Sequence, residues 1–128
     1  MKRVLVVDDE RLTRVSLAAF LEELGYEAAV AGDGDEAIRL QAQAPFDVCI
    51  VDIRLPGKDG VETIKALHQI APEAYFIIFT GSPQFTIPPV LEDLGMSARD
   101  IVRKPVVDMD IFAALIVRKD ASSQERSG

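Results

Sequence analysis

Cysteine is nearly absent from this sequence of 128 residues, and its single copy, Cys49, lies inside an apolar run. One cysteine excludes a disulfide framework and fits a reducing compartment, so we expect a cytoplasmic protein. We interpret Cys49 as a small buried hydrophobic side chain and not as a reactive thiol.

Long apolar runs are also missing. The first residues, MKRVLVVDDE, contain only four consecutive apolar residues before three acids, too few for a signal peptide or a bilayer span. Acidic residues outnumber basic ones: the sequence has 21 aspartates and glutamates and 14 lysines and arginines, which gives a net charge of −7. Such a surface repels phosphate backbones, so we expect this domain to bind neither nucleic acid nor membranes.

What is present is an ordinary globular composition, with 48% apolar and 27% charged residues, in a chain of single-domain length. Five short apolar runs alternate with five stretches of helical periodicity. The apolar runs are residues 4–7, 27–31, 48–51, 75–79 and 101–102, and the helical stretches are residues 12–24, 33–43, 61–70, 89–94 and 108–117. This alternation predicts an α/β protein with a parallel sheet that helices cover on both faces.

Polar side chains follow four of the five predicted strands. Asp8 and Asp9 follow the first, Asp52 the third, Thr80 the fourth and Lys104 the fifth. Ligand sites in such sheets lie outside the carboxyl ends of the strands, so these five side chains are expected at one edge. For any single acid, capping a loop or a helix is an equal alternative. The set at four strand ends favours a functional site.

Three neighbouring carboxylates need a counter-charge. Two carboxylates about 5 Å apart repel each other by roughly 3 kcal/mol at an effective dielectric constant of about 20. A cation must therefore bind, or one carboxyl group must stay protonated. All-oxygen ligation with room for water favours Mg²⁺.

The segments VLVVDDE, PFDVCIVDIRLPGKDG and FTGS, together with Lys104 and Pro105, resemble the receiver domain of bacterial two-component response regulators. The resemblance runs over residues 2–117. It implies a doubly wound, five-stranded parallel sheet of the (βα)5 flavodoxin-like type, with strand order 2-1-3-4-5. We expect residues 1–117 to form this receiver domain and residues 118–128 to form a polar, disordered tail or linker stub.

The resemblance implies a role for each residue at the edge. Asp52 would be the phosphoacceptor, taking a phosphoryl group from a phosphohistidine. Asp9 and Asp52 would bind Mg²⁺ directly and Asp8 through water, while the backbone carbonyl of Arg54 would complete the protein's ligands. The side chain of Lys104 would neutralise charge on the phosphoryl oxygens.

Thr80 would hydrogen-bond the attached phosphoryl group and so detect it. The family usually carries a tyrosine or phenylalanine three residues before the lysine, but this chain has Ile101. The segment from Thr80 to Lys104 is also about two residues longer than expected and is rich in proline. We therefore predict that the signal passes through the loop of residues 80–89 and the short helix behind it, and that Ile101 contributes mainly by packing.

The implied function is a switch in two-component signalling, phosphorylated by a sensor histidine kinase or a phosphotransfer protein. Such a domain catalyses its own phosphorylation and dephosphorylation and is not an enzyme with a separate substrate. The output partner is a downstream protein or a fused effector domain, and phosphorylation-dependent homodimerisation is a further expectation. Two alternatives stay open: a Mg²⁺-dependent phosphatase of the haloacid-dehalogenase type, and a pseudo-receiver that binds partners without phosphorylation.

Overall fold

A computed structural model describes residues 2–127, with side chains described as far as Ala121. The strands are β1 (Arg3–Val7), β2 (Glu27–Ala31), β3 (Val48–Val51), β4 (Tyr75–Thr80) and β5 (Ile101–Arg103). The helices are α1 (Arg11–Glu23), α2 (Gly34–Gln43), α3 (Gly60–Ile70), α4 (Pro89–Glu92) and α5 (Asp110–Ser127), with a 3₁₀ turn, η1 (Ala98–Asp100), before β5. No helix within this described part is long and apolar enough to cross a bilayer.

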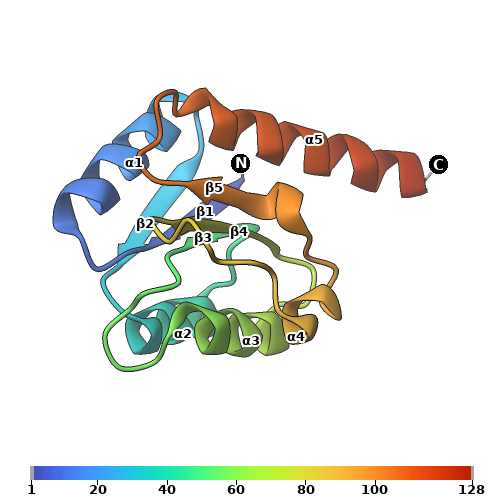
Figure 1. Ribbon diagram of the computed structural model, residues 1–128. Helices are drawn as coiled ribbons and strands as arrows, with labels where there is room; N and C mark the ends of the chain where they lie inside the picture. Colours follow the sequence, from blue (N-terminus) through green and yellow to red (C-terminus); the bar gives the residue numbers. More distant parts are fainter. Residues whose placement is uncertain (1, 128) are drawn as a thin grey trace.

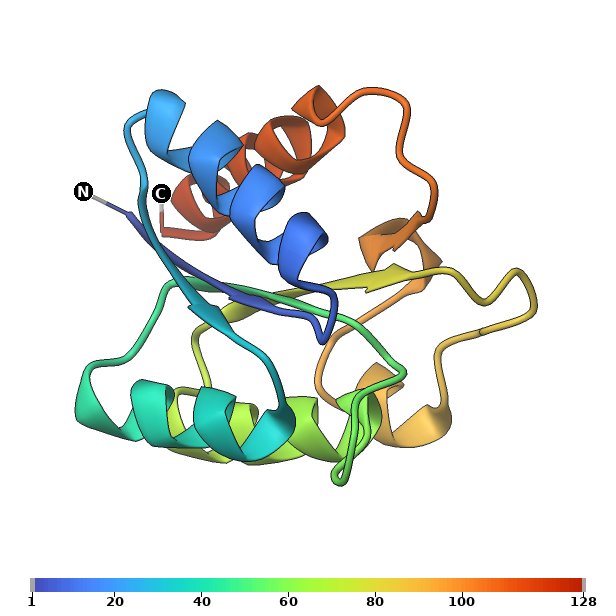
Figure 2. The same ribbon diagram turned by 90° about the vertical axis from the view of Figure 1, so that its left-hand side faces the viewer.

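The five strands form one sheet in the order β2-β1-β3-β4-β5, and all paired strands are parallel. Helices α1 and α5 cover one face, and α2, α3 and α4 cover the other (Figures 1 and 2). The predicted fold class and strand order are confirmed.

Two hydrophobic cores lie on the two faces of the sheet, and each strand supplies side chains to both. Along β1, Val4 and Val6 pack toward α1 and α5, while Leu5 and Val7 pack toward the other three helices. All four residues of β3 are buried as well, including Cys49. Burial raises the pKa of the Cys49 thiol to about 12, so it stays protonated and uncharged near neutral pH. This supports its interpretation as a buried hydrophobic side chain.

Asp59 and Gly60 fix the path from β3 into α3. The Asp59 carboxylate caps the helix by accepting a hydrogen bond from the Glu62 N–H at 2.9 Å. Gly60 packs against the backbone that follows β3, where a Cβ atom would lie 2.6 Å from the Cα of Ile53 and closer still to the carbonyl oxygen of Asp52. The start of α3 can reach the end of β3 only because residue 60 has no side chain.

The C-terminal segment differs from the sequence prediction. The sequence predicted a polar, disordered tail or linker stub from Arg118, whereas in the structure α5 continues without interruption to Ser127. Residues 118–127 contain no proline or glycine that would end a helix, and the Lys2 ammonium holds Asp120 at 2.8 Å. The boundary at residue 117 between receiver domain and linker stays a prediction.

Replacing Gly60 with alanine should destabilise the protein by on the order of 2 kcal/mol or more, because the methyl group overlaps backbone that cannot easily move. Denaturant unfolding of the parent and of Gly60→Ala measures the difference. Gly81→Ala is the matched control, since its Cβ would meet nothing closer than 3.9 Å. Its free energy of unfolding should stay within about 0.5 kcal/mol of the parent value. Equal effects of the two substitutions would contradict the close approach at Gly60.

Candidate functional site

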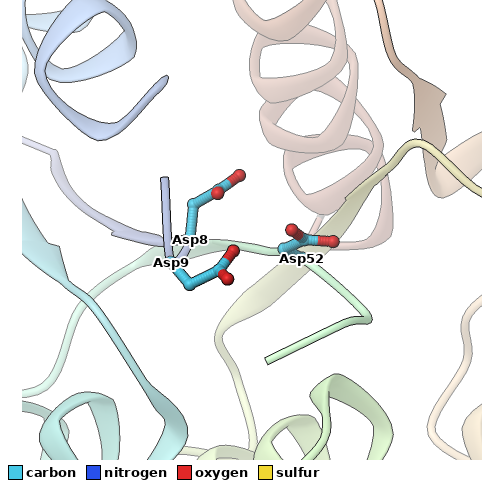
Figure 3. A group of neighbouring side chains, drawn as sticks. All are labelled: Asp8, Asp9 and Asp52. Carbon is cyan, nitrogen blue, oxygen red and sulfur yellow. The ribbon is translucent and has the colours of Figure 1, made fainter. Parts of the chain in front are cut away.

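Three carboxylates gather where β1 and β3 end. Asp8 and Asp9 follow β1, Asp52 follows β3, and the two strands are neighbours in the sheet. Figure 3 shows the three side chains beside one another, and one carboxylate oxygen from each lies within 4.8 Å of the others. Asp8 and Asp52 are buried, whereas Asp9 is exposed to solvent. The predicted carboxylate cluster is confirmed.

The ammonium group of Lys104 lies between the two buried carboxylates. It donates hydrogen bonds to Asp8 Oδ2 at 2.8 Å and to Asp52 Oδ2 at 3.2 Å. Lys104 follows β5, so this contact crosses the sheet from its edge strand to its centre. One cation is thus shared by two buried anions, which leaves the cluster with excess negative charge.

Burial and neighbouring charges oppose each other in this cluster. Burial, with a smaller effect from the Asp8 charge, raises the pKa of Asp52 and outweighs the lowering by the Lys104 charge and by the Arg54 N–H hydrogen bond. Burial alone would lower the pKa of Lys104, but the hydrogen bond to Asp8 and the charges of Asp8 and Asp52 together raise it. Lys104 is therefore held as a cation, while Asp52 is ionised at some cost to folding.

Backbone groups hold the carboxylates in place. Asp8 Oδ1 accepts a hydrogen bond from the Glu10 N–H at 2.9 Å, and Asp52 Oδ1 accepts one from the Arg54 N–H at 3.2 Å. Arg54 is thus at the site through its N–H, while a metal-binding role for its carbonyl stays a prediction.

Two further residues belong to this edge although the sequence analysis did not single them out. The Glu10 carboxylate lies 3.4 Å from Lys104 Nζ, and the Arg14 guanidinium donates to the carbonyl oxygen of Asp8 at 2.8 Å. Glu10 could have been found because it directly follows the acidic pair. Arg14 could not, because only the folding of α1 against the β1–α1 loop brings it there.

Thr80 and Ile101 make no contact with the Lys104 ammonium among the described hydrogen bonds and ion pairs. Thr80 is fully buried at the end of β4, and its hydroxyl accepts a hydrogen bond from the Ser82 N–H at 3.1 Å. Ile101 begins β5, pairs with Ile78 in register and packs into the core on the side of α2, α3 and α4. Ile101 is therefore at the opposite end of its strand from Lys104 and contributes packing, not a polar contact.

The donor set suits a divalent cation that prefers oxygen ligands. Three carboxylates outweigh the single Lys104 ammonium, and the exposed Asp9 leaves water an approach to the cluster. Hard cations such as Mg²⁺ bind a few carboxylates and keep several waters. The residues present therefore fit Mg²⁺.

Comparison with known proteins agrees with this geometry. A family model described as the response regulator receiver domain matches residues 4–116. The chain is 32% identical to the chemotaxis protein CheY of Thermotoga maritima, over 89% of this chain and 94% of that one. It is also 32% identical to protein-glutamate methylesterase/protein-glutamine glutaminase 2 of Caulobacter vibrioides, covering 97% of this chain but only 36% of that protein.

A solved structure shows the same arrangement. The response regulator TrrA of Thermotoga maritima, in complex with Mg(2+)-BeF, superposes with a TM-score of 0.79 at 29% identity, and the match covers 92% of this chain and 98% of that one. The present chain thus shares its overall fold with a solved response regulator.

Substituting Asp52 with asparagine should stabilise the protein at pH 7 in the presence of a chelator. The raised folded-state pKa of Asp52 means that the parent loses stability as the pH rises above its unfolded-state value, near 3.8, through the folded-state value. The variant avoids this loss, so its advantage should be largest at neutral pH and should disappear as the pH approaches 3.8. Urea unfolding at several pH values measures it. Asp93→Asn, at an exposed acid, is the control and should show no such pH-dependent gain; a gain of the same size there would contradict the interpretation.

Proposed function

The chain belongs to the response regulator receiver domain family, and we propose that Asp52 is the residue that accepts its phosphoryl group. Receiver domains of this family are phosphorylated by histidine kinases or phosphotransfer proteins. The observation that carries the proposal is the buried Asp52 carboxylate, which follows the central strand and shares the Lys104 ammonium with Asp8. No other acid in the described part of the chain combines that position with that contact.

The proposed reaction is a phosphoryl transfer from nitrogen to oxygen. A carboxylate oxygen of Asp52 attacks the phosphorus of a phosphohistidine, the P–N bond breaks, and the imidazole leaves with the bonding pair. The product is an aspartyl phosphate. The Arg54 N–H orients the Asp52 carboxylate through its hydrogen bond at 3.2 Å. The Lys104 ammonium, already 3.2 Å from the other carboxylate oxygen, offsets negative charge that builds up beside it.

We propose that Asp9 and Asp52 hold Mg²⁺ directly, that Asp8 holds it through water, and that the Arg54 carbonyl completes the protein's ligands. When bound, the ion supplies positive charge next to the phosphoryl oxygens. The exposure of Asp9 supports its role as a direct ligand, because its carboxylate is not enclosed by other protein groups.

We propose that Thr80 detects the attached phosphoryl group. Its side chain is buried at the end of β4, and as the Ser82 N–H uses an acceptor position, the hydroxyl proton is free to be donated. Ile101 contributes through packing, since an aliphatic side chain has no hydroxyl group that could change its hydrogen-bond partner between two states.

The phosphatase alternative is not favoured, because the family model that matches residues 4–116 is that of the response regulator receiver domain. Receiver domains are generally signalling domains and not enzymes. The complete set of acids, threonine and lysine in this chain also disfavours a pseudo-receiver. The kinase, the output partner, homodimerisation and a cytoplasmic location stay predictions.

Incubation with phosphoramidate or acetyl phosphate and Mg²⁺ should add the mass of one phosphoryl group to the protein. The added mass should be absent in Asp52→Asn and retained in Asp93→Asn, which changes an exposed acid elsewhere. Intact-protein mass spectrometry measures both. Labelling of Asp52→Asn at the parent level would show that another side chain is the acceptor.

Millimolar Mg²⁺ should raise the melting temperature, because binding relieves the repulsion among the carboxylates. Stabilisation follows RT ln(1 + [L]/Kd) and is on the order of 1 to 3 kcal/mol for a well-saturated site. Asp9→Asn should lose most of this gain, whereas Asp35→Asn, at an exposed position in α2, should keep it. A full response of Asp9→Asn to Mg²⁺ would remove Asp9 from the ligand set.

A further inference from the structure

Arg103, the last residue of β5, has an unusual set of partners. Its guanidinium donates from Nη1 to the Ser82 carbonyl at 2.7 Å and from Nη2 to the Phe85 carbonyl at 2.8 Å. Among the described ion pairs it has none with a carboxylate, so both bonds go to the backbone of the loop between β4 and α4. A planar guanidinium can bond two acceptors at once, and a lysine ammonium cannot match that fork.

The loop that Arg103 holds begins at Thr80. Thr80 and Arg103 are partners in the β4–β5 register, and the Lys104 N–H donates to the Thr80 carbonyl at 2.8 Å. Ser82, whose carbonyl Arg103 binds, donates its own N–H to the Thr80 hydroxyl. A continuous chain of hydrogen bonds therefore runs from the Thr80 side chain through Ser82 to the Arg103 side chain.

Arg103 also reaches the side of the molecule near α4. Side chains two residues apart on a strand share a face, so Arg103 and Ile101 lie on the same face of β5. The two line a pocket of about 260 Å³ together with Phe85, Ile87 and Glu92. The hydrogen-bonded chain from Thr80 thus ends in the wall of a pocket between the β4–α4 loop, α4 and β5.

We propose that Arg103 couples the turn after Thr80 to strand β5, so that a movement of Thr80 toward a phosphoryl group on Asp52 is passed to the α4–β5 side. Arg103 is a positioning residue in this proposal, acting through Ser82 on Thr80. The inference rests on the proposed phosphoacceptor role of Asp52. Through Arg103, β5 has a polar connection to the turn after Thr80, which Ile101 on the same strand cannot provide because it has no hydroxyl group.

The first test needs no phosphoryl group. Without its two bonds from Arg103, the turn should open more often, and the Ser82 amide should exchange with solvent about five to ten times faster in Arg103→Ala. Arg103→Lys keeps the charge but loses the fork, and it should show most of the same increase. Arg99→Ala, at an exposed arginine in η1, is the matched control and should exchange as the parent does. Unchanged exchange in both Arg103 variants would overturn the proposal.

The second test follows amide NMR shifts on adding Mg²⁺ and beryllofluoride. The Arg54 amide, bonded to Asp52, reports binding at the site, and the amides of Leu91 and Ile101 report the α4–β5 side. In the parent, in Arg99→Ala and in Ile101→Val, the amide of Arg54 and the amides of residues 91 and 101 should all shift. In Arg103→Ala and Arg103→Lys, Arg54 should shift as in the parent, while the shifts of Leu91 and Ile101 should fall at least about threefold.

The outcomes separate the two proposals. If Arg54 does not shift in the parent, the proposed function is wrong. If Arg54 shifts but Leu91 and Ile101 respond equally in the parent and in both Arg103 variants, the phosphoacceptor site stands and the coupling through Arg103 is wrong. Failure of Leu91 and Ile101 to shift in the parent also overturns the coupling.

Discussion

The Lys104 ammonium, shared between the buried carboxylates of Asp8 and Asp52, is the interaction on which the site depends. Two buried anions at neighbouring strand ends would repel each other strongly without it. One cation does not balance the acids around it, because Asp9 and Glu10 add further negative charge. The resulting deficit of positive charge makes the site suited to bind a divalent cation. Burial raises the pKa of the Asp52 carboxyl group, so its ionisation opposes folding.

This arrangement is costly in stability, and the rest of the fold supports it. Val4 to Val7 and Val48 to Val51 are almost entirely buried, so β1 and β3 form a rigid centre that presents their terminal acids at fixed positions. Gly60 lets α3 start directly against the end of β3, and the backbone N–H groups of Glu10 and Arg54 orient the carboxylates. The apolar layers therefore position charges that would otherwise move apart into water.

The two faces of the sheet pack against different elements. The α1 and α5 face is a closed core that includes Val102 of β5, whereas Ile101 and the loop residues Phe85 and Ile87 pack on the opposite face. Alternation along β5 thus links one short strand to the core on one side and to the loop after Thr80 on the other. Residues 80–89 directly follow the edge of the sheet that carries the proposed phosphoacceptor, so the proposed path between the site and α4 is short.

The sequence by itself determined the strands, the parallel sheet with helices on both faces, and the acids, threonine and lysine at the strand ends. These properties follow from local periodicity and from the rule that parallel strands share one carboxyl edge. Only the tertiary structure decided that Lys104 bonds both Asp8 and Asp52, that Arg14 supports the Asp8 carbonyl, and that Arg103 holds the loop after Thr80. It also decided that α5 runs past residue 117, where composition alone indicated a tail. The reason is that side chains far apart in the sequence meet only through the packing of whole elements, which local patterns do not encode.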